Sequence, residues 1–161
     1  MSFLHPYLLT PQPENWIMKK LSKENIKLIE INESNTKLIR KFLLGCDKSL
    51  KTFRYFKKRN IEQAIKLHEY TIVVTHEDSV VGYGHLDRDC YHTWLGICVA
   101  DRWTGLGIGK IIMEELTQKF PKKRLCLTVD EENEVAIKLY KGYGFETIKN
   151  VTKDVILMER K

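Results

Sequence analysis

The chain of 161 residues is long enough for one domain with a single core, and its 43% hydrophobic and 30% charged residues are typical of a soluble globular protein. No apolar run approaches the ~20 residues of a membrane span, and the N-terminus has neither the basic start nor the apolar segment of a secretion signal. Four cysteines without paired spacing predict reduced thiols in a cytoplasmic protein rather than disulfides or zinc ligands. The net charge of +6 favours an anionic partner, which can be a phosphate-bearing small molecule, nucleic acid or an acidic surface.

The first part of the chain predicts an arm followed by a folded domain. Residues 1–26 hold three of the four prolines, so we expect an N-terminal arm there and one domain over residues 27–161. Before residue 70, the expected elements are a strand over 27–32, a helix from a cap at Ser34 or Asn35 to Gly45, and a helix over 61–68 capped by Asn60.

Hydrophobic periodicity predicts an antiparallel meander and then alternating helices and strands. Ile108, Ile112, Leu116 and Phe120 recur at i+4 spacing, which is typical of one buried helix face, and Pro121 stops that helix. The expected ranges are 70–75, 80–86 and 91–100 for the meander, 111–120 for a helix, 125–129 for a buried strand, 133–141 for a helix and 155–158 for a closing strand. This order predicts a single mixed α/β domain.

A glycine-rich stretch follows the third strand of the meander, with the pattern Arg102-x-x-Gly105-x-Gly107-x-Gly109-Lys110. Glycines let the backbone take a positive φ and approach a ligand closely. The first N–H groups of the next helix have no partner inside the helix, and the positive end of its dipole lies at the same place. This turn is therefore expected to cradle a pyrophosphate.

Two better-known phosphate loops do not fit this stretch. A P-loop needs Ser or Thr after Gly-Lys and a glycine five positions before that Gly-Lys pair, but Ile111 follows the lysine and Thr104 occupies the earlier position. The dinucleotide fingerprint Gly-x-Gly-x-x-Gly needs a different spacing and lies near the start of its unit. Both of these nucleotide classes are excluded.

A second motif lies in the helix expected over 133–141. Asn133, Ala136, Ile137 and Tyr140 fall at offsets of 0, 3, 4 and 7, so they share one helix face. The small alanine lets a ligand lie close to the helix, the amide can hydrogen-bond another amide, and the phenol can donate a proton. A pantetheine chain, with its amides, methylenes and terminal thiol, suits such a face.

The two motifs, in this order and separated by one buried strand, resemble the GNAT superfamily of acetyl-CoA-dependent N-acetyltransferases. The second motif continues through Leu139-Tyr140 to Gly144-Phe145, and the resemblance extends over about residues 27–159. It implies a mixed α+β fold, with a central, mostly antiparallel sheet flanked by helices. It also implies that this sheet is splayed between the strands at 93–100 and 125–129, where the donor enters.

The resemblance implies acetyl-CoA as the acetyl donor and no metal. Backbone groups of the splayed strand would pair with pantetheine like an added strand, and the loop N–H groups would hold the pyrophosphate. The implied cofactor-binding residues are Ile97, Cys98 and Val99 on the strand, Arg102, Gly105, Leu106, Gly107, Ile108, Gly109 and Lys110 in the loop, and Asn133 and Tyr140 on the last helix.

The implied reaction is direct attack of a neutral amine on the thioester, which needs an acid, a base and oxyanion donors. Tyr140 suits the acid because a phenol, with a pKa of about 10, is protonated at neutral pH. The strand before the loop holds no Asp or Glu, so the base is open; His85 is the candidate, beside a purely structural role, and Asp87 is weaker. Cys98 is expected to pack, because the family forms no covalent intermediate. The histidines at 5, 68, 76 and 92 are expected on the surface or in packing roles.

The acceptor pocket is expected near the aromatic and basic run from Phe53 to Arg59, where this family commonly shapes its acceptor site. Aromatic rings stack on sugars or bases, and arginine grips phosphate bidentately. Together with the stretch 83–87, the run loosely resembles members from surface-polysaccharide pathways, which implies a nucleotide-linked amino sugar as acceptor. The substrate-binding candidates are Arg54, Tyr55, Tyr83 and His85.

Other functions stay open at this point. A polyamine acceptor would need an acidic groove, and the net positive charge of the chain disfavours this. A protein or peptide amine is a further acceptor class, and a non-catalytic acetyl-CoA-binding module is disfavoured by the intact Tyr140. A nucleic-acid-binding module is disfavoured because no motif for it is present. The oligomeric state is left open.

Overall fold

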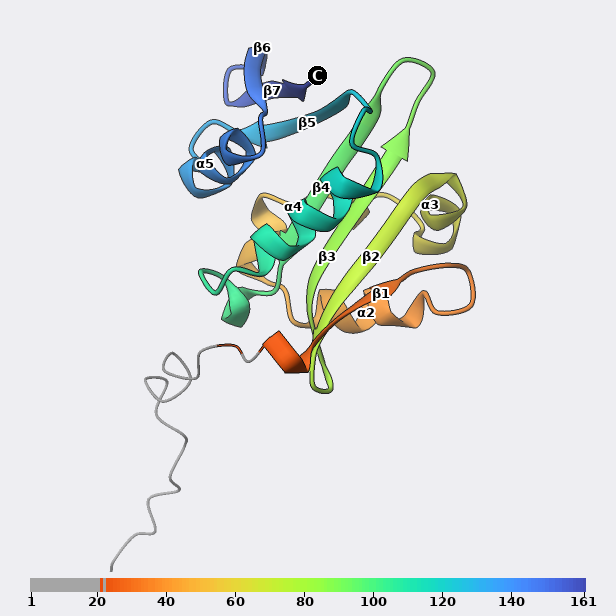
Figure 1. The fold of residues 1–161 in the computed structure, drawn as a ribbon. Coiled ribbons are helices and arrows are strands. Elements are labelled where there is room, and N and C mark those ends of the chain that lie inside the picture. The colour runs from red at the N-terminus through yellow and green to blue at the C-terminus, as the bar shows by residue number, and fades with distance from the viewer. Residues whose placement is uncertain (1–20, 22) are drawn as a thin grey trace, which may run out of the picture.

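The computed structural model describes residues 21 and 23–161 and shows a seven-stranded sheet with helices on both faces (Figure 1). The arm predicted for residues 1–26 lies largely outside the described residues. In chain order the elements are η1 (Lys23–Asn25), β1 (Ile26–Glu30), α2 (Lys37–Leu44), η2 (Lys48–Lys51), η3 (Tyr55–Lys57), α3 (Ile61–Leu67), β2 (His68–His76), β3 (Ser79–Arg88), β4 (Thr93–Val99), η4 (Asp101–Trp103), α4 (Ile108–Lys119), β5 (Leu125–Asp130), α5 (Glu134–Gly142), β6 (Glu146–Thr152) and β7 (Val155–Arg160).

The sheet has the strand order β1-β2-β3-β4-β5-β7-β6. Neighbouring strands run antiparallel, except that β4 and β5 are parallel. The predicted meander of β2, β3 and β4 and the mostly antiparallel mixed fold are confirmed. The β4–β5 pairing covers only Thr93 with Leu125 and Trp94 with Cys126, so the two strands separate toward their carboxyl ends. The splay expected between these strands is therefore present.

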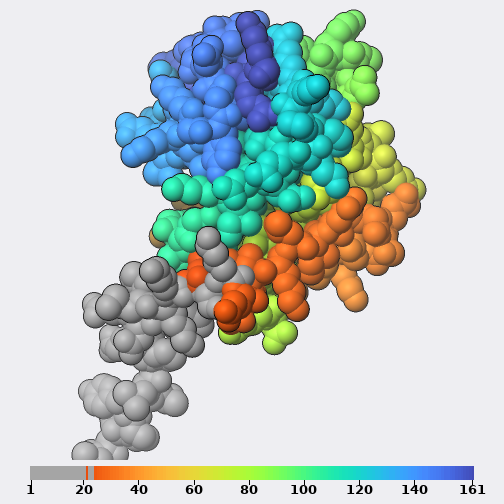
Figure 2. Space-filling model, in the orientation of Figure 1, coloured from red at the N-terminus to blue at the C-terminus, as the bar shows by residue number. Residues whose placement is uncertain are grey.

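Two apolar clusters lie on opposite faces of the sheet. One joins α4 and α5 to alternate residues of the central strands, and the other joins α2 and α3 to the opposite side chains of β2, β3 and β4. Ile108, Ile112 and Leu116 of α4 are each at most 1% exposed, as their i+4 spacing predicts. Burial of each such side chain stabilises the fold by about 1.5–3 kcal/mol. Figure 2 shows the segments after β5 lying directly against α4.

Local signals explain most of the helix ends. The Asn60 side chain accepts from the Gln63 N–H and starts α3, as predicted. Gly45 follows α2, also as predicted, but the residue before its first turn is Thr36 rather than Ser34 or Asn35. The Asn35 side chain is instead engaged in the preceding turn, where it accepts from the Asn32 N–H at 2.8 Å.

Strand β6 was not predicted. All seven of its residues are exposed, and its register against β7 shifts twice, so the sequence lacks the strict alternation that marks a half-buried strand. The closing strand predicted for 155–158 is β7, which extends to Arg160. Across the residues that the structure describes, none of the helices has the length and apolar character needed to cross a membrane.

Candidate active site

A pocket of about 110 Å³ lies where β4 and β5 separate. Three elements provide most of its lining: β4 with Leu95, Gly96 and Ile97, β5 with Thr128, Val129 and Asp130, and the α5 segment with Asn133 and Tyr140. The segment Thr52–Arg54, before η3, forms a further wall. Because β4 pairs with β5 only at its first two residues, the edge of β4 that faces β5 has no strand partner from Leu95 onward. A ligand strand can pair along this edge.

The glycine loop leads from β4 into the N-terminus of α4 and has the conformation that an anion cradle needs. Gly105 and Gly107 have φ values of +75° and +88°, and a Cβ at either position would meet nothing within 4 Å. Gly107 caps α4, whose first turn contains no acidic residue. The first N–H groups of that helix have no intrahelical acceptor, so they are available to a ligand. Arg102 and Lys110 are exposed beside the loop, so the residues present fit a pyrophosphate.

Helix α5 brings Asn133 and Tyr140 to the pocket. Asn133 precedes the first turn, and its side-chain oxygen accepts from the Ala136 N–H at 3.3 Å, so part of its hydrogen-bonding capacity is used in capping the helix. Tyr140 is 7% exposed, and burial raises the pKa of its phenol above the usual value. A phenol in this environment is protonated at neutral pH and can donate a proton.

The thiol of Cys98 is buried on β4, on the face toward α2 and α3. Hydrogen bonding with Cys46 and burial raise the pKa of Cys98, so the thiolate is disfavoured. Its neighbour Val99 uses its carbonyl to accept a hydrogen bond from Ser49 Oγ at 2.7 Å. In the part of the chain that the structure describes, no group of three or more His, Cys, Asp or Glu side chains could hold a metal ion.

His85 lies beneath the pocket rather than in its lining. It is 2% exposed, and its ring lies directly against Gly96, where a Cβ would come within 2.4 Å of the imidazole Cε1. Its Nδ1 is 2.9 Å from the hydroxyl of Tyr83, which is fully buried. Burial, followed by the nearby His68, lowers the pKa of His85 well below its usual value, so the imidazole is neutral at pH 7.

A directed hydrogen-bond chain fixes Tyr55 next to this imidazole. Because a carboxylate only accepts, the Tyr55 hydroxyl donates to Asp87 at 2.8 Å and accepts from His68 Nε2 at 2.6 Å. His68 Nδ1 then accepts from the Thr71 hydroxyl at 2.7 Å. The His68 ring stacks on His85 at 4.5 Å, and burial lowers the pKa of His68 to about 4. His68 thus has a packing role, one of the two expected from the sequence, within a half-buried polar cluster.

The substrate-binding candidates are consequently divided. Arg54 lines the pocket, whereas Tyr55, Tyr83 and His85 do not. Tyr83 packs on the face covered by α2 and α3, His85 is buried beside it, and the half-buried Tyr55 lies against His85. Fewer of these residues reach the pocket than the sequence predicted. The reason is packing, since the half-buried Phe53 lies against the rings of Tyr55 and Tyr83.

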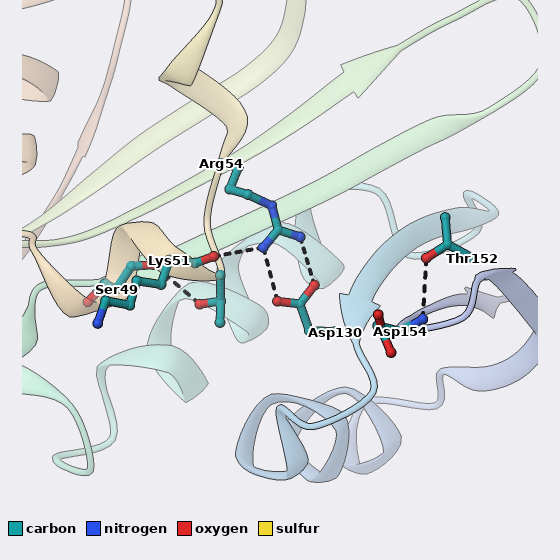
Figure 3. Close-up of polar contacts among 7 residues, drawn as sticks. Ser49, Lys51, Arg54, Asp130, Thr152 and Asp154 are labelled. Atoms are coloured by element: carbon teal, nitrogen blue, oxygen red, sulfur yellow. Dashed lines mark hydrogen bonds and ion pairs between the residues drawn. The ribbon is translucent and has the colours of Figure 1, made fainter.

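Arg54 does not have a free guanidinium. Its Nη2 lies 2.7 Å from Asp130 Oδ1 and its Nη1 lies 3.1 Å from Asp130 Oδ2, a bidentate pair that Figure 3 shows. Nη1 also donates to the Lys51 carbonyl at 2.7 Å. Sequence reasoning missed Asp130; its one signal was a carboxylate at the end of a buried strand, directly before the second motif.

Asp101 is a second missed residue, and it anchors the pocket wall to the glycine loop. It accepts from the backbone N–H groups of Asp47, Lys48 and Ser49 at 3.0, 2.8 and 2.9 Å and from the Ser49 hydroxyl. The Ser49 hydroxyl, together with these N–H groups, lowers the pKa of Asp101 to about 2. The start of η2 is thereby fixed to the turn that follows β4.

We expect Asp101→Ala to lower the free energy of unfolding by about 1.5 kcal/mol, the low end of the range for hydrogen bonds to charged groups, because the carboxylate is partly exposed. Thermal melting at pH 7 should then fall by about 3–6 °C. Since the pKa is depressed in the folded state, this contribution is present above the unfolded value of about 3.9 and is lost as the pH falls toward about 2. The two proteins should therefore converge in acid, and a pH-independent difference would contradict this role.

Comparisons with known proteins agree with this geometry. The sequence model described as the acetyltransferase (GNAT) family matches residues 18–145. The L-amino acid N-acetyltransferase AaaT of Escherichia coli (strain K12) is 34% identical over 84 residues, which cover 47% of this chain and 52% of that protein. The chain thus spans about half the length of this relative.

Solved structures show the same fold at low identity. The acetyltransferase yncA of Salmonella typhimurium, determined with acetyl-CoA, has a TM-score of 0.66 at 14% identity, with 85% of this chain and 94% of that chain covered. A GCN5-related N-acetyltransferase from Kribbella flavida has a TM-score of 0.65 at 22% identity, with 86% and 99% covered.

Proposed function

Because the chain belongs to the acetyltransferase (GNAT) family, we propose that it moves the acetyl group of acetyl-CoA to the amine of a small acceptor. The observation that carries this proposal is the pocket between β4 and β5, where Tyr140 lies beside an unpaired strand edge. The glycine loop with its free helix N-terminus lies at the end of the same strand β4.

The donor fits two features of this chain. The N–H groups from Gly105 to Lys110 would hold the pyrophosphate, and the free edge of β4 would pair with the pantetheine amides. Ile97, Cys98 and Val99 provide that edge, although the Val99 carbonyl is already engaged by Ser49. Acetyl-CoA would supply an acyl carbon activated as a thioester.

The residues around the pocket suit direct transfer. The acceptor nitrogen forms a bond to the acyl carbon, the carbon–sulfur bond breaks, and the leaving sulfur takes a proton from the Tyr140 hydroxyl. A backbone N–H near Val99 is the proposed donor to the developing oxyanion. The acceptor must also lose a proton, and His85 remains the proposed base because its neutral imidazole lies directly against Gly96 of the pocket.

A free amino acid is the acceptor class that we propose. The relative from Escherichia coli is named for that activity, and a pocket of about 110 Å³ suits a small head group. Pockets that enclose drug-sized ligands measure about 300–1,000 Å³. The nucleotide-linked amino sugar expected from the sequence has less support, because it is far larger than this pocket. Its diphosphate would also take Arg54 from Asp130 without bringing a neighbouring cation to that carboxylate.

An acceptor panel tests this proposal. The full chain is incubated with acetyl-CoA and either free amino acids, nucleotide-linked amino sugars, spermidine or short peptides, and thiol release is followed while mass spectrometry identifies the acetylated product. We expect turnover on amino acids. Turnover confined to another class of amine would overturn the acceptor assignment, and no thiol release with any amine would overturn the acetyltransferase proposal itself.

A further inference from the structure

The ion pair between Arg54 and Asp130 joins two parts of the pocket lining. Asp130 is the last residue of β5, and Arg54 precedes η3 on the opposite wall, 76 positions earlier in the chain. Since β4 and β5 pair only at Thr93 and Trp94, at the other end of the strands, this contact joins the two walls where no sheet hydrogen bonds do. Both side chains line the same pocket as Tyr140.

The pair is arranged so that one partner can be exchanged while the other stays in place. The Arg54 side chain is 48% exposed and that of Asp130 is 24% exposed, so water screens their attraction and another ion can compete for it. The Lys51 carbonyl accepts from Arg54 Nη1 independently of Asp130. If Asp130 releases the guanidinium, this bond keeps the arginine at the pocket and leaves Nη2 free.

We propose that Arg54 and Asp130 together select a zwitterionic acceptor. The acceptor replaces the ion pair between the two side chains with one ion pair to each of them. The carboxylate of an amino acid takes the place of Asp130 on the guanidinium, and its ammonium takes the place of Arg54 at the Asp130 carboxylate. This assignment rests on the proposed acetyltransferase function and names the residues that select its acceptor. The bidentate geometry favours a planar carboxylate, which matches the guanidinium fork.

The balance of charges in the pocket explains why a zwitterion is preferred over other amines. An α-amino acid carries both charges on neighbouring groups, so every charge in the pocket keeps a partner. A polyamine would satisfy Asp130 and leave Arg54 unpaired, and a simple anion would do the reverse. A charged group that the bound acceptor covers and leaves without a partner costs more than the lost contact itself. A neutral or singly charged acceptor is therefore discriminated against without any steric barrier.

Paired acceptors test the exchange. L-Alanine, L-leucine and L-phenylalanine are compared with their carboxamides, which keep the ammonium but lack the carboxylate, at saturating acetyl-CoA. Arg54→Ala should raise the KM of the amino acids about tenfold or more and should not raise the KM of the carboxamides, which lack the carboxylate that Arg54 binds. Asp130→Asn should raise the KM of both members of each pair, since both carry the ammonium. The KM for acetyl-CoA should stay nearly constant in all variants.

Two further variants make the result decisive. Arg54→Lys keeps the charge but loses the fork, so it should fall between wild type and Arg54→Ala and provides a second test if the alanine variant does not fold. Arg40→Ala is the matched control, because Arg40 forms a surface ion pair with Glu62 and lies outside the pocket lining.

The failure of this proposal is distinguishable from failure of the enzymatic assignment. If wild type releases thiol with an amine but Arg54→Ala loses equally on amino acids and carboxamides, the charge-reading role is overturned and the acetyltransferase stands. Wild-type preference for carboxamides over amino acids would overturn it in the same way. If wild type acetylates no amine at all, the proposed function fails, and the inference with it.

Discussion

Replacement of Tyr140 by phenylalanine is expected to lower kcat roughly 10²-fold while acetyl-CoA affinity stays nearly unchanged. The substitution removes one hydroxyl and keeps the ring that packs against Phe145, at a centroid distance of 6.0 Å. Without that hydroxyl, the leaving sulfur must depart without a proton from the protein. Steady-state kinetics and calorimetric binding of acetyl-CoA separate the two effects.

The raised pKa of Tyr140 adds a pH test. Because burial holds this pKa above the usual value of about 10, the phenol stays protonated and kcat should show no alkaline loss from this group below about pH 10. Tyr91→Phe is the matched control, since it removes the same atom from a side chain that is 88% exposed. A Tyr140→Phe variant with wild-type kcat would remove Tyr140 from the mechanism.

The second large effect is expected at the glycine loop. Gly107→Glu should weaken acetyl-CoA binding at least about tenfold, or ~1.4 kcal/mol. Gly107 has a φ of +88°, which a side chain tolerates poorly, and the new carboxylate would lie where the pyrophosphate is expected. Calorimetry measures the affinity, and circular dichroism checks that the fold is retained.

Gly142→Glu provides the matched control for this loop. Gly142 ends α5 without a left-handed φ, and a Cβ there would meet nothing within 4 Å, so the same charge enters away from the cradle. Equal losses for both variants would indicate a general effect of the added negative charge. Unchanged affinity for Gly107→Glu would mean that the loop is not the phosphate site.

Features encoded within a few neighbouring residues could be predicted from the sequence. The glycines at 105 and 107 predict a turn with positive φ, and the i+4 apolar repeat predicts the helix that follows it. The face shared by Asn133 and Tyr140 follows from helical spacing alone, and both residues line the pocket. These signals depend on local backbone geometry, so no tertiary information is needed.

Features that depend on distant contacts could not be predicted. No sequence pattern predicts the contact between Arg54 and Asp130, because the two residues come together only when the sheet has formed. The partners of Asp101 are also more than 50 positions away. As a result, the sequence predicted that Arg54 binds a phosphate, whereas the structure shows Arg54 in an ion pair with Asp130.

The burial of a side chain is the other quantity that could not be predicted from the sequence alone. His85 has a suitable intrinsic pKa for a base, but only the structure shows it enclosed beneath Gly96 and stacked on His68, where its pKa is lowered. The exposed strand β6 is the opposite case: solvent on both sides leaves no hydrophobic alternation to detect.

Amide hydrogen exchange in the presence and absence of CoA tests the central claim, that the splayed β4 edge and the glycine loop form one donor site. We expect slower exchange on CoA binding at two segments, residues 97–99 and 105–110. The turn between β3 and β4, residues 89–92, should change little, because it lies at the end of β4 that still pairs with β5. Slower exchange confined to other segments, in a protein that still binds CoA, would contradict it.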